Sequence, residues 1–349
     1  MGKRTIMVTG GAGFIGSNFV RLLLAREPEL TLVNLDALTY AGNLASLGDC
    51  LDNPRHVFVK GDIRDPELVE RVIREHAVEG IINFAAESHV DRSITGPQVF
   101  IETNVGGTLN LLVKARDLGV RRFLQVSTDE VYGSLGAEGF FTETTPLSPN
   151  SPYSASKAGA DHLVNAFHHT YGLDTVITRC SNNYGPYQFP EKLIPLMIRN
   201  ALADRSLPVY GTGLNVRDWL YVDDHCLAIW AAYTRGVAGE VYNVGGSNER
   251  TNLDVIHTIL AQLNKPESLI TYVKDRLGHD LRYAIDASKI ARDLDWRPTV
   301  DFADGIAKTV AWYLANQEWV EQVASGEYQH YYETMYAQRG AADSHGVLA

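Results

Sequence analysis

The sequence has little cysteine. Its 349 residues include Cys50, Cys180 and Cys226, which lie far apart and form no Cys-x-x-Cys pair. We therefore expect small buried side chains in a reducing compartment instead of a disulfide framework, and we expect no metal site. Long hydrophobic runs are also missing, since no stretch approaches the roughly 18 apolar residues of a membrane span. No segment resembling a signal peptide precedes the first predicted strand, so we expect a soluble, cytoplasmic protein without a membrane partner.

Positive charge is also in short supply. Lys and Arg number 31 against 42 Asp and Glu, which gives a formal net charge of −11. Nucleic-acid binding needs a basic face, so this balance argues against a nucleic-acid partner. It leaves room for an anionic small molecule, which needs only a few Arg, Lys and backbone N–H groups. The hydrophobic content of 45% and charged content of 21% are those of an ordinary globular protein.

Short apolar runs alternate with longer amphipathic stretches through the first half of the chain. Strands are predicted at residues 5–9, 32–35, 57–60, 80–85, 123–126 and 175–179, and helices at 15–26, 67–76 and 99–118. Repetition of strand, helix and strand predicts right-handed βαβ units. The strands are apolar on both faces, as expected where helices cover both sides. The pattern predicts an α/β fold with a doubly wound parallel sheet.

The regular alternation ends near residue 181. The Asn-, Pro-, Gly- and Tyr-rich stretch 181–195 predicts a long loop before a helix. Beyond it, predicted strands at 241–244 and 270–273 mix with predicted helices at 223–234, 253–264 and 301–315. We interpret residues 1–180 as the first domain and residues 181–335 mainly as a smaller mixed α/β substrate-binding lobe. Some later segments of the chain are expected to return to the first domain, and residues 336–349 to form a frayed tail.

A glycine motif follows the first predicted strand. In MVTGGAGFIGSN (residues 7–18), Gly10, Gly13 and Gly16 are spaced G-x-x-G-x-x-G. Such glycines allow a tight turn, close approach of backbone to a pyrophosphate and close helix–strand packing. The motif alone is as well explained by a plain turn. Asp36 decides the matter, because it ends the second predicted strand, where an acid binds the adenosine ribose hydroxyls. We therefore predict a Rossmann-type dinucleotide-binding domain.

The residues after Asp36 bear on the choice between NAD and NADP. They are Ala37, Leu38 and Thr39, and none is basic. An acid without a basic neighbour repels a ribose phosphate, so NAD is favoured. Asp62 and Ile63 follow the third predicted strand and are candidates to flank the adenine, although Asp62 could equally cap the helix that begins near Pro66.

A tyrosine and a lysine are spaced for redox chemistry. Tyr153 and Lys157 lie four residues apart in NSPYSASKAGAD (150–161), after the helix-start signals Ser151 and Pro152, so both fall on one helix face. We expect the ammonium to lower the phenol pKa from near 10 towards neutrality. A tyrosinate beside a nicotinamide removes the proton of a hydroxyl whose carbon gives up hydride. Such a pair alone is more often a solvated helix face, but the preceding dinucleotide-binding half reverses that preference.

These motifs together resemble those of a known family. The glycine motif with Tyr153-x-x-x-Lys157 resembles the extended short-chain dehydrogenase/reductases, which work on nucleotide sugars. Four longer strings are similar to the dTDP-glucose 4,6-dehydratase family: FAAESHVDRSI (84–94), STDEVYG (127–133), SNNYGPYQFPEKLIP (181–195) and RDWLYVDDH (217–225). The resemblance covers residues 5 to about 315. It implies NAD as cofactor, dTDP-glucose as substrate, and a closed cycle of oxidation at carbon 4, loss of water across carbons 5 and 6, and hydride return to carbon 6.

Two adjacent acids, Asp129 and Glu130, follow a buried predicted strand, where a polar turn would be the simplest explanation. Loss of water from a 4-keto sugar needs a base at carbon 5 and an acid at carbon 6. Two nearby carboxylates raise one another's proton affinity, so one can stay protonated. The resemblance implies that Asp129 is the acid and Glu130 the base, and that Thr128 holds the carbon-4 oxygen beside Tyr153.

The resemblance also implies the other contacts. For the cofactor they are Gly10, Gly13, Phe14, Ile15, Gly16, Asp36, Ala37, Leu38, Thr39, Asp62, Ile63, Ala85, Ala86, Ser88, Thr103, Tyr153, Lys157 and Asn183. For the substrate they are Ser88, His89, Thr128, Asn182, Glu191, Lys192, Leu193, Pro208, Val209, Tyr210, Arg217, Asn252, Asp280, Arg282 and Tyr283. Arg217 and Arg282 are candidates for the diphosphate. The family commonly has Pro and Arg where this chain has Leu277 and Leu281, and the sequence does not decide whether that weakens diphosphate binding.

Other interpretations stay open at this point. A nucleotide-sugar 4-epimerase would share the glycines, Tyr153 and Lys157, but has no use for the acid pair. A GDP-mannose or CDP-glucose dehydratase differs only in base recognition, and a catalytically silent dinucleotide sensor would not need the full catalytic set. Relatives pair two helices, here residues 101–119 and 154–172, across a two-fold axis, which implies a homodimer. The alternative is that both helices only cover the sheet.

Overall fold

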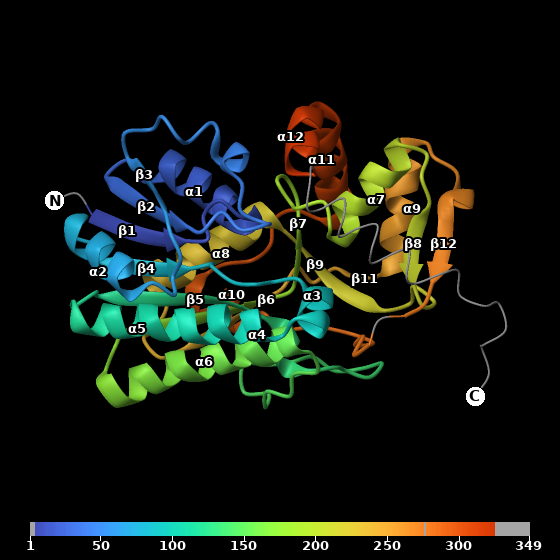
Figure 1. The fold of residues 1–349 in the computed structure, drawn as a ribbon. Coiled ribbons are helices and arrows are strands. Elements are labelled where there is room, and N and C mark those ends of the chain that lie inside the picture. Colours follow the sequence, from blue (N-terminus) through green and yellow to red (C-terminus); the bar gives the residue numbers. More distant parts are fainter. Residues whose placement is uncertain (1–3, 276, 325–349) are drawn as a thin grey trace.

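The computed structural model describes residues 4–275 and 277–324. The predicted tail (336–349) and residues 325–335 of the predicted second lobe lie outside them. A seven-stranded parallel sheet forms the centre of the larger part, in the order β10-β6-β5-β4-β1-β2-β3 (Figure 1). Its strands are β1 (Arg4–Thr9), β2 (Leu30–Asp36), β3 (His56–Lys60), β4 (Gly80–Asn83), β5 (Arg122–Thr128), β6 (Thr175–Cys180) and β10 (Val241–Val244).

Helices cover both faces of this sheet (Figure 1). One face carries α1 (Phe14–Arg26), α8 (Val222–Arg235) and α10 (Ser288–Leu294), and the other carries α2 (Pro66–Glu75), α5 (Thr108–Asp117) and α6 (Pro152–Tyr171). Successive residues of β1 alternate between the faces, because Ile6 and Val8 join the core beneath α1 and α8, whereas Met7 joins the core beneath α2 and α5. The predicted doubly wound parallel sheet is confirmed.

The smaller part contains two small sheets. Strands β7 and β9 pair in parallel and β11 joins β9 antiparallel, while β8 and β12 form a separate parallel pair. Ile194, Met197 and Ile256 belong to its own apolar core. The smaller mixed α/β unit is confirmed. Its elements are β7 (Asn182–Tyr184), β8 (Leu207–Tyr210), β9 (Val216–Tyr221), β11 (Glu249–Thr251), β12 (Ile270–Val273), α7 (Leu193–Leu202), α9 (Asn252–Leu263), α11 (Phe302–Ala315) and α12 (Gln317–Val323).

The two parts interleave along the chain. The strand predicted at 241–244 is β10, which pairs with β6 at the edge of the large sheet and not with the smaller part. A domain boundary at residue 180 therefore stays a prediction. The remaining short elements are α3 (Val90–Thr95), α4 (Gln98–Phe100), and the 3-10 helices η1 (Leu44–Leu47), η3 (Asp129–Tyr132) and η4 (Glu267–Leu269). Within the described residues, no helix is both long enough and apolar enough to cross a membrane.

The helix predicted at 99–118 is present as an unbroken helical stretch over residues 98–117, but its hydrogen-bond pattern changes within it. A π-helical segment, η2 (Ile101–Gly107), separates α4 from α5. Gly106 and Gly107 fall in this segment, and glycine is among the weakest helix formers. Gly107 also lies against Ile63, because an added Cβ would be 2.5 Å from the Cδ1 atom of that side chain. Segments of π-helix often mark functional sites.

Candidate active site

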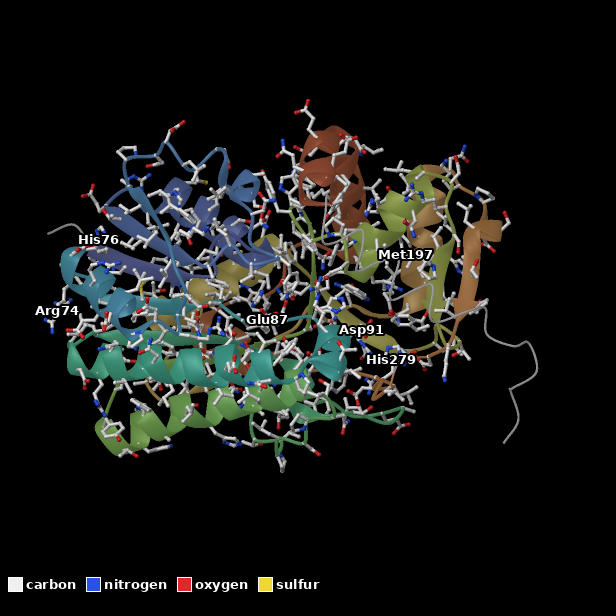
Figure 2. The ribbon with its side chains drawn as sticks, in the orientation of Figure 1. Arg74, His76, Glu87, Asp91, Met197 and His279 are labelled. Atoms are coloured by element: carbon white, nitrogen blue, oxygen red, sulfur yellow. The ribbon has the colours of Figure 1, made fainter. Side chains whose placement is uncertain are left out.

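Two neighbouring cavities lie where the larger part meets the smaller one. The first has a volume of about 320 Å³ and follows the carboxyl ends of β1, β2, β4, β5 and β6, where open parallel sheets bind their ligands. The second, of about 190 Å³, extends into the smaller part. Glu130, Asn182, Glu191 and Lys192 line both, so the two cavities adjoin at these residues. In Figure 2, Glu87 and Asp91 lie centrally, and Met197 and His279 lie on the side of the smaller part.

The glycine motif forms one wall of the larger cavity. Gly10 has a φ of +71°, and a Cβ there would lie 2.7 Å from the backbone nitrogen of Ala85. A Cβ on Gly16 would lie 2.3 Å from the carbonyl oxygen of Gly10, so only glycine lets α1 begin this close to β1. Gly13 is the N-cap of α1 and lines the cavity, which leaves the first N–H groups of that helix facing the open space.

Asp36 is buried at the end of β2. Its two carboxylate oxygens accept hydrogen bonds from the backbone N–H groups of Ala12 and Leu38, each at 2.8 Å. Burial raises the pKa of Asp36, and these two hydrogen bonds oppose that shift. Leu38 adopts a left-handed φ of 53° and is not in the cavity lining, so its contribution is a backbone contact to Asp36.

Asp62 lines the same cavity and is paired with a basic neighbour. The guanidinium of Arg64 lies 2.7 Å from its Oδ2 atom. Burial would raise the pKa of Asp62, but hydrogen bonds and charge from Arg64 outweigh it and lower the pKa. The alternative that Asp62 caps α2 is wrong, because Asp65 accepts the N-terminal hydrogen bonds of that helix, from Glu67 and Leu68. The basic Arg64 in this lining was not predicted from the sequence.

The adjacent acids begin η3, directly after β5. Thr128 is the N-cap, and its hydroxyl accepts a hydrogen bond from the Glu130 N–H at 3.3 Å. Asp129 is 1% exposed; its Oδ1 accepts from the Thr128 hydroxyl at 3.4 Å, and its Oδ2 has no hydrogen-bond partner among the described residues. Burial, then the charges of Glu130 and Asp218, raise the pKa of Asp129 well above its usual value. This shift favours the protonated form of Asp129, which suits it to donate a proton.

Tyr153 and Lys157 lie on the buried side of α6, which begins with a capping box between Ser151 and Ser154. The Tyr153 phenol lies beside Thr128 in the lining of the larger cavity, and the Lys157 ammonium donates to the Val126 carbonyl at 2.7 Å. The expected lowering of the Tyr153 pKa by Lys157 is wrong for the chain by itself. Burial, followed by the charge of Glu130, raises the phenol pKa well above 10, and burial lowers the pKa of Lys157.

Asn104 lies between the loop after β4 and helix α6, and it was not predicted from the sequence. From the π-helical segment, its side chain accepts from the Glu87 N–H at 2.8 Å and donates to the Glu87 carbonyl at 3.0 Å and the Ser156 hydroxyl at 2.8 Å. Asn104 therefore ties the loop after β4 to the helix that carries Tyr153. The glycine pair that follows it was the available signal.

Cys180 and Asp218 were also missed. Cys180 lines the larger cavity, but burial raises the pKa of its thiol to about 12, which leaves it protonated. Asp218 is buried beneath the site and accepts from the N–H groups of Gly246 at 2.8 Å and Asn248 at 2.6 Å. No sequence spacing links β9, which carries Asp218, to Asp129. Among the described residues, no group of His, Cys, Asp and Glu is arranged to hold a metal ion.

A buried charged group closes the junction between the cavities. The Glu191 carboxylate lies 3.5 Å from the Arg92 guanidinium and 3.9 Å from the His89 ring. Burial raises the pKa of Glu191 to about 7, against the charges of Lys192 and Arg92. The Lys192 ammonium donates to the Ser88 carbonyl at 2.9 Å, which joins the loop before α7 to the loop after β4.

Arg217 lines the smaller cavity. Its guanidinium lies 4.3 Å from the centre of the Tyr283 ring and donates to the carbonyls of Val216 at 2.7 Å and Asp280 at 2.9 Å. Arg282 points elsewhere, because it forms a double hydrogen bond with the Glu249 carboxylate at 2.6 and 2.9 Å.

The comparisons with known proteins agree on one family. A family model described as GDP-mannose 4,6 dehydratase matches residues 7–309. A dTDP-glucose 4,6-dehydratase from Xanthomonas campestris pv. campestris (strain B100) is 59% identical over 343 residues, covering 93% of this chain and 97% of that protein. The chain belongs to the dTDP-glucose 4,6-dehydratase family. The resemblance noted in the sequence is confirmed.

Solved structures place the chain within this family and near its relatives. The dTDP-glucose 4,6-dehydratase from Streptomyces venezuelae, solved with NAD and a dTDP ligand, has a TM-score of 0.89 and 54% identity over 91% of this chain and 99% of that one. A UDP-glucose 4-epimerase from Thermotoga maritima has a TM-score of 0.84 but only 29% identity, over 90% of this chain and 99% of that one. The epimerases therefore share the fold, while the dehydratases share much more of the sequence.

The structure brings together most of the residues that dehydratase resemblance implied. The larger cavity is lined by Gly10, Gly13, Phe14, Ile15, Gly16, Asp36, Ala37, Thr39, Asp62, Ile63, Ala85, Ala86, Ser88, Thr103, Thr128, Asp129, Glu130, Tyr153, Lys157, Asn182, Asn183, Glu191 and Lys192. The smaller is lined by His89, Glu130, Asn182, Glu191, Lys192, Leu193, Pro208, Val209, Tyr210, Arg217, Asn252 and Tyr283.

Three implied residues line neither cavity: Leu38, Asp280 and Arg282. Asp280 supports the site from behind, because it accepts a hydrogen bond from the Tyr283 hydroxyl and another from Asn150 at 2.6 Å. A diphosphate contact by Arg282 stays a prediction and would require its bond with Glu249 to rearrange. Leu277 and Leu281, at the positions that depart from the family pattern, are both exposed.

Proposed function

We propose that this protein converts dTDP-glucose to dTDP-4-keto-6-deoxyglucose and water, using NAD that is restored in every cycle. The observation that carries the proposal is the pair Asp129–Glu130, placed beside Tyr153 in one cavity. The pair adds to a redox site a buried acid whose protonated form is favoured, and oxidation at carbon 4 alone has no need of one.

The larger cavity fits NAD. Gly13, the N-cap of α1, lines the cavity and leaves the first N–H groups of that helix facing it, which suits a pyrophosphate, and the buried carboxylate of Asp36 suits ribose hydroxyls. Buried oxygens of Asn182 and Asn183 have no hydrogen-bond partner among the described residues, so they can accept from a ligand. NAD, when bound, supplies the oxidant for carbon 4, the reductant for carbon 6 and the positive charge of its nicotinamide ring.

Tyr153 and Thr128 act on the carbon-4 hydroxyl. The two side chains line the same cavity and interact with each other, so both can approach one substrate oxygen. Tyr153 accepts the hydroxyl proton as carbon 4 is oxidised, and Thr128 holds the oxygen in place. Lys157, held by the Val126 carbonyl, lies on the same helix face and offers a positive charge that favours the tyrosinate form of Tyr153, which accepts this proton and becomes a neutral phenol.

Elimination then uses the two acids. The new carbonyl at carbon 4 makes the carbon-5 proton acidic, and Glu130 accepts that proton. Asp129, whose protonated form burial favours, gives its proton to the departing carbon-6 hydroxyl, which leaves as water. Solvent access supports this division, because Asp129 is buried whereas Glu130 is only partly buried and lines both cavities.

The decisive experiment is incubation of the purified protein with dTDP-glucose, and separately with UDP-, GDP- and CDP-glucose. We expect dTDP-glucose to react faster than the other three, with loss of one water and formation of a 4-keto-6-deoxy sugar that shows base-induced absorbance. A product that keeps its mass and differs only at carbon 4 would instead identify an epimerase. Protein purified without added cofactor should release NAD on denaturation, and absence of nicotinamide together with no stimulation by added NAD would contradict the closed cycle.

The proposed assembly is a homodimer built on η2, α5 and α6. Ile101, Leu109 and Tyr171 on these helices are 50%, 39% and 52% exposed, which is apolar surface available to a second copy. Light scattering at working concentration should give twice the mass of the chain, and a monomeric mass would contradict this. We also propose a cytoplasmic location, which the three unpaired buried cysteines support and cell fractionation tests.

A further inference from the structure

The loop at residues 181–192 serves both cavities. It supplies Asn183 and Gln188 to the larger cavity, and Asn182, Glu191 and Lys192 to both. Its outer side rests on an aromatic cluster formed by Tyr187 with Trp312, Tyr313 and Trp319 of the C-terminal helices α11 and α12, which we call the aromatic clamp. We propose that the aromatic clamp is a positioning device for the reaction, with Tyr187 and Tyr313 holding the loop in its ligand-binding shape.

Tyr187 is held on several sides. Its ring centre lies 4.5 Å from that of Trp312 and 5.6 Å from that of Trp319. The Arg21 guanidinium lies 3.9 Å from the centre of the same ring, and Asp49 fixes that guanidinium with hydrogen bonds of 2.6 to 3.0 Å. Aromatic pairs and a cation over a ring each add to simple burial.

The backbone at Tyr187 is strained. Its φ of 65° lies in the left-handed region, which bulky residues rarely adopt. Such a conformation persists only where the surroundings impose it. At Tyr187, hydrogen bonds hold the residues before and after it. The Asn18 amide donates to the Pro186 carbonyl at 3.0 Å, and the Tyr313 hydroxyl donates to the Gln188 carbonyl at 2.5 Å.

The clamp is linked to the ligand-facing side within a few residues. The Gln188 amide donates to the Asn183 carbonyl at 2.9 Å, and both residues line the larger cavity. On the other side of Tyr187, the chain continues to Glu191 and Lys192, which line both cavities. Trp319 is itself anchored, since its indole N–H donates to the Ser46 hydroxyl at 3.2 Å. A shift of Tyr187 therefore displaces groups at the junction of the two cavities.

Loosening the aromatic clamp should weaken substrate binding more than it slows the chemical steps. This expectation rests on the proposed function. Thr128, Asp129, Glu130, Tyr153 and Lys157 come from β5, η3 and α6, which the clamp does not touch. Loosening the clamp should thus raise KM for dTDP-glucose and change kcat little, because the loop must be ordered when substrate binds.

Three variants test this. Tyr187→Asn removes the ring but keeps a residue that tolerates the left-handed backbone, and should raise KM about tenfold, the scale of one or two such ring contacts, with kcat within about threefold of wild type. Tyr313→Phe removes only the hydroxyl that holds Gln188 and should raise KM in the same sense by a smaller factor. Tyr187→Phe keeps the ring and should leave KM near wild type.

The matched control is Trp230→Leu. Trp230 packs with Phe19 and Tyr233 and lines neither cavity, so its loss should lower Tm without raising KM. Wild-type KM in Tyr187→Asn and Tyr313→Phe would overturn the proposal, as would an equal rise in the control. If Tyr187→Asn fails to fold, Tyr313→Phe decides alone. If wild type does not turn over dTDP-glucose, the proposed function fails, and calorimetric binding of dTDP to the same variants still tests the clamp.

Discussion

Replacement of Asp129 by Asn separates the oxidation half of the reaction from the elimination half. The change is nearly isosteric, and the amide oxygen can still accept the hydrogen bond from Thr128 that Oδ1 accepts now. The amide nitrogen takes the place of Oδ2, which has no hydrogen-bond partner among the described residues. Only the proton that the carbon-6 hydroxyl needs is lost. The site should stay folded, take the carbon-4 proton with Tyr153, and stop.

The size of both effects follows from the surroundings of Asp129. Loss of an acid catalyst lowers the rate by roughly 10² to 10⁴. Stability should change in the opposite direction. The folded-state pKa of Asp129 is raised above its unfolded value of about 4, so its contribution to stability is complete at acid pH and is lost as pH rises. Asp129→Asn removes that penalty, so its Tm should exceed that of wild type near pH 7, with the difference shrinking towards pH 4.

The assay follows bound NADH by absorbance on mixing with dTDP-glucose, alongside product formation. We expect NADH to accumulate while product falls at least about 10²-fold, and the double variant Asp129→Asn with Glu130→Gln should show the same block. Asp52→Asn, an exchange at an exposed acid, serves as control and should match wild type. The reasoning is refuted if the variant turns over at a near-normal rate. It is equally refuted if a folded, NAD-loaded variant forms no NADH.

Three further outcomes follow from the described geometry. Tyr153→Phe should form little NADH, because the first proton is never taken; rapid NADH formation in stopped-flow absorbance would contradict its role. Gly10→Ala should lose bound NAD, since the Cβ would lie 2.7 Å from the Ala85 nitrogen; a wild-type cofactor content after purification would count against that wall as the cofactor site. Burial lowers the pKa of His225 to about 3, so below pH 6.5 this group should lower the unfolding free energy by about 1.4 kcal/mol for each unit by which the pH falls. Denaturant titrations at several pH values measure this dependence of unfolding free energy on pH, which should be smaller by that amount in His225→Leu. An unchanged pH dependence in the variant would argue against it.

Features set by local sterics could be predicted from the sequence. Gly10 and Gly16 are required because their Cβ atoms would overlap neighbouring backbone, and such requirements appear as fixed spacings. Strands covered on both faces also show themselves as continuous apolar runs, and the parallel sheet followed from them. Asp36 was found for the same reason, since it lies at the end of such a run.

Features set by distant partners could not be predicted. The environment of Asp129 includes Asp218 from β9, and the direction of Arg282 depends on Glu249 in β11. The π-helical segment that presents Asn104 interrupts a pattern that reads as one helix. In each case the deciding contact joins segments that no periodicity relates.

The expected pKa values show where pairwise reasoning from the sequence stops. Two adjacent carboxylates were expected to raise one another's proton affinity, and the charge of Glu130 does raise the pKa of Asp129, but burial is the larger cause. Lys157 was expected to lower the pKa of Tyr153, and burial reversed the sign. Burial also breaks the symmetry between the two acids, because it raises the pKa of Asp129 while Glu130 is only partly buried and faces both cavities. Adjacency in the sequence identified the pair, and the difference in burial favours Asp129 as the acid and Glu130 as the base.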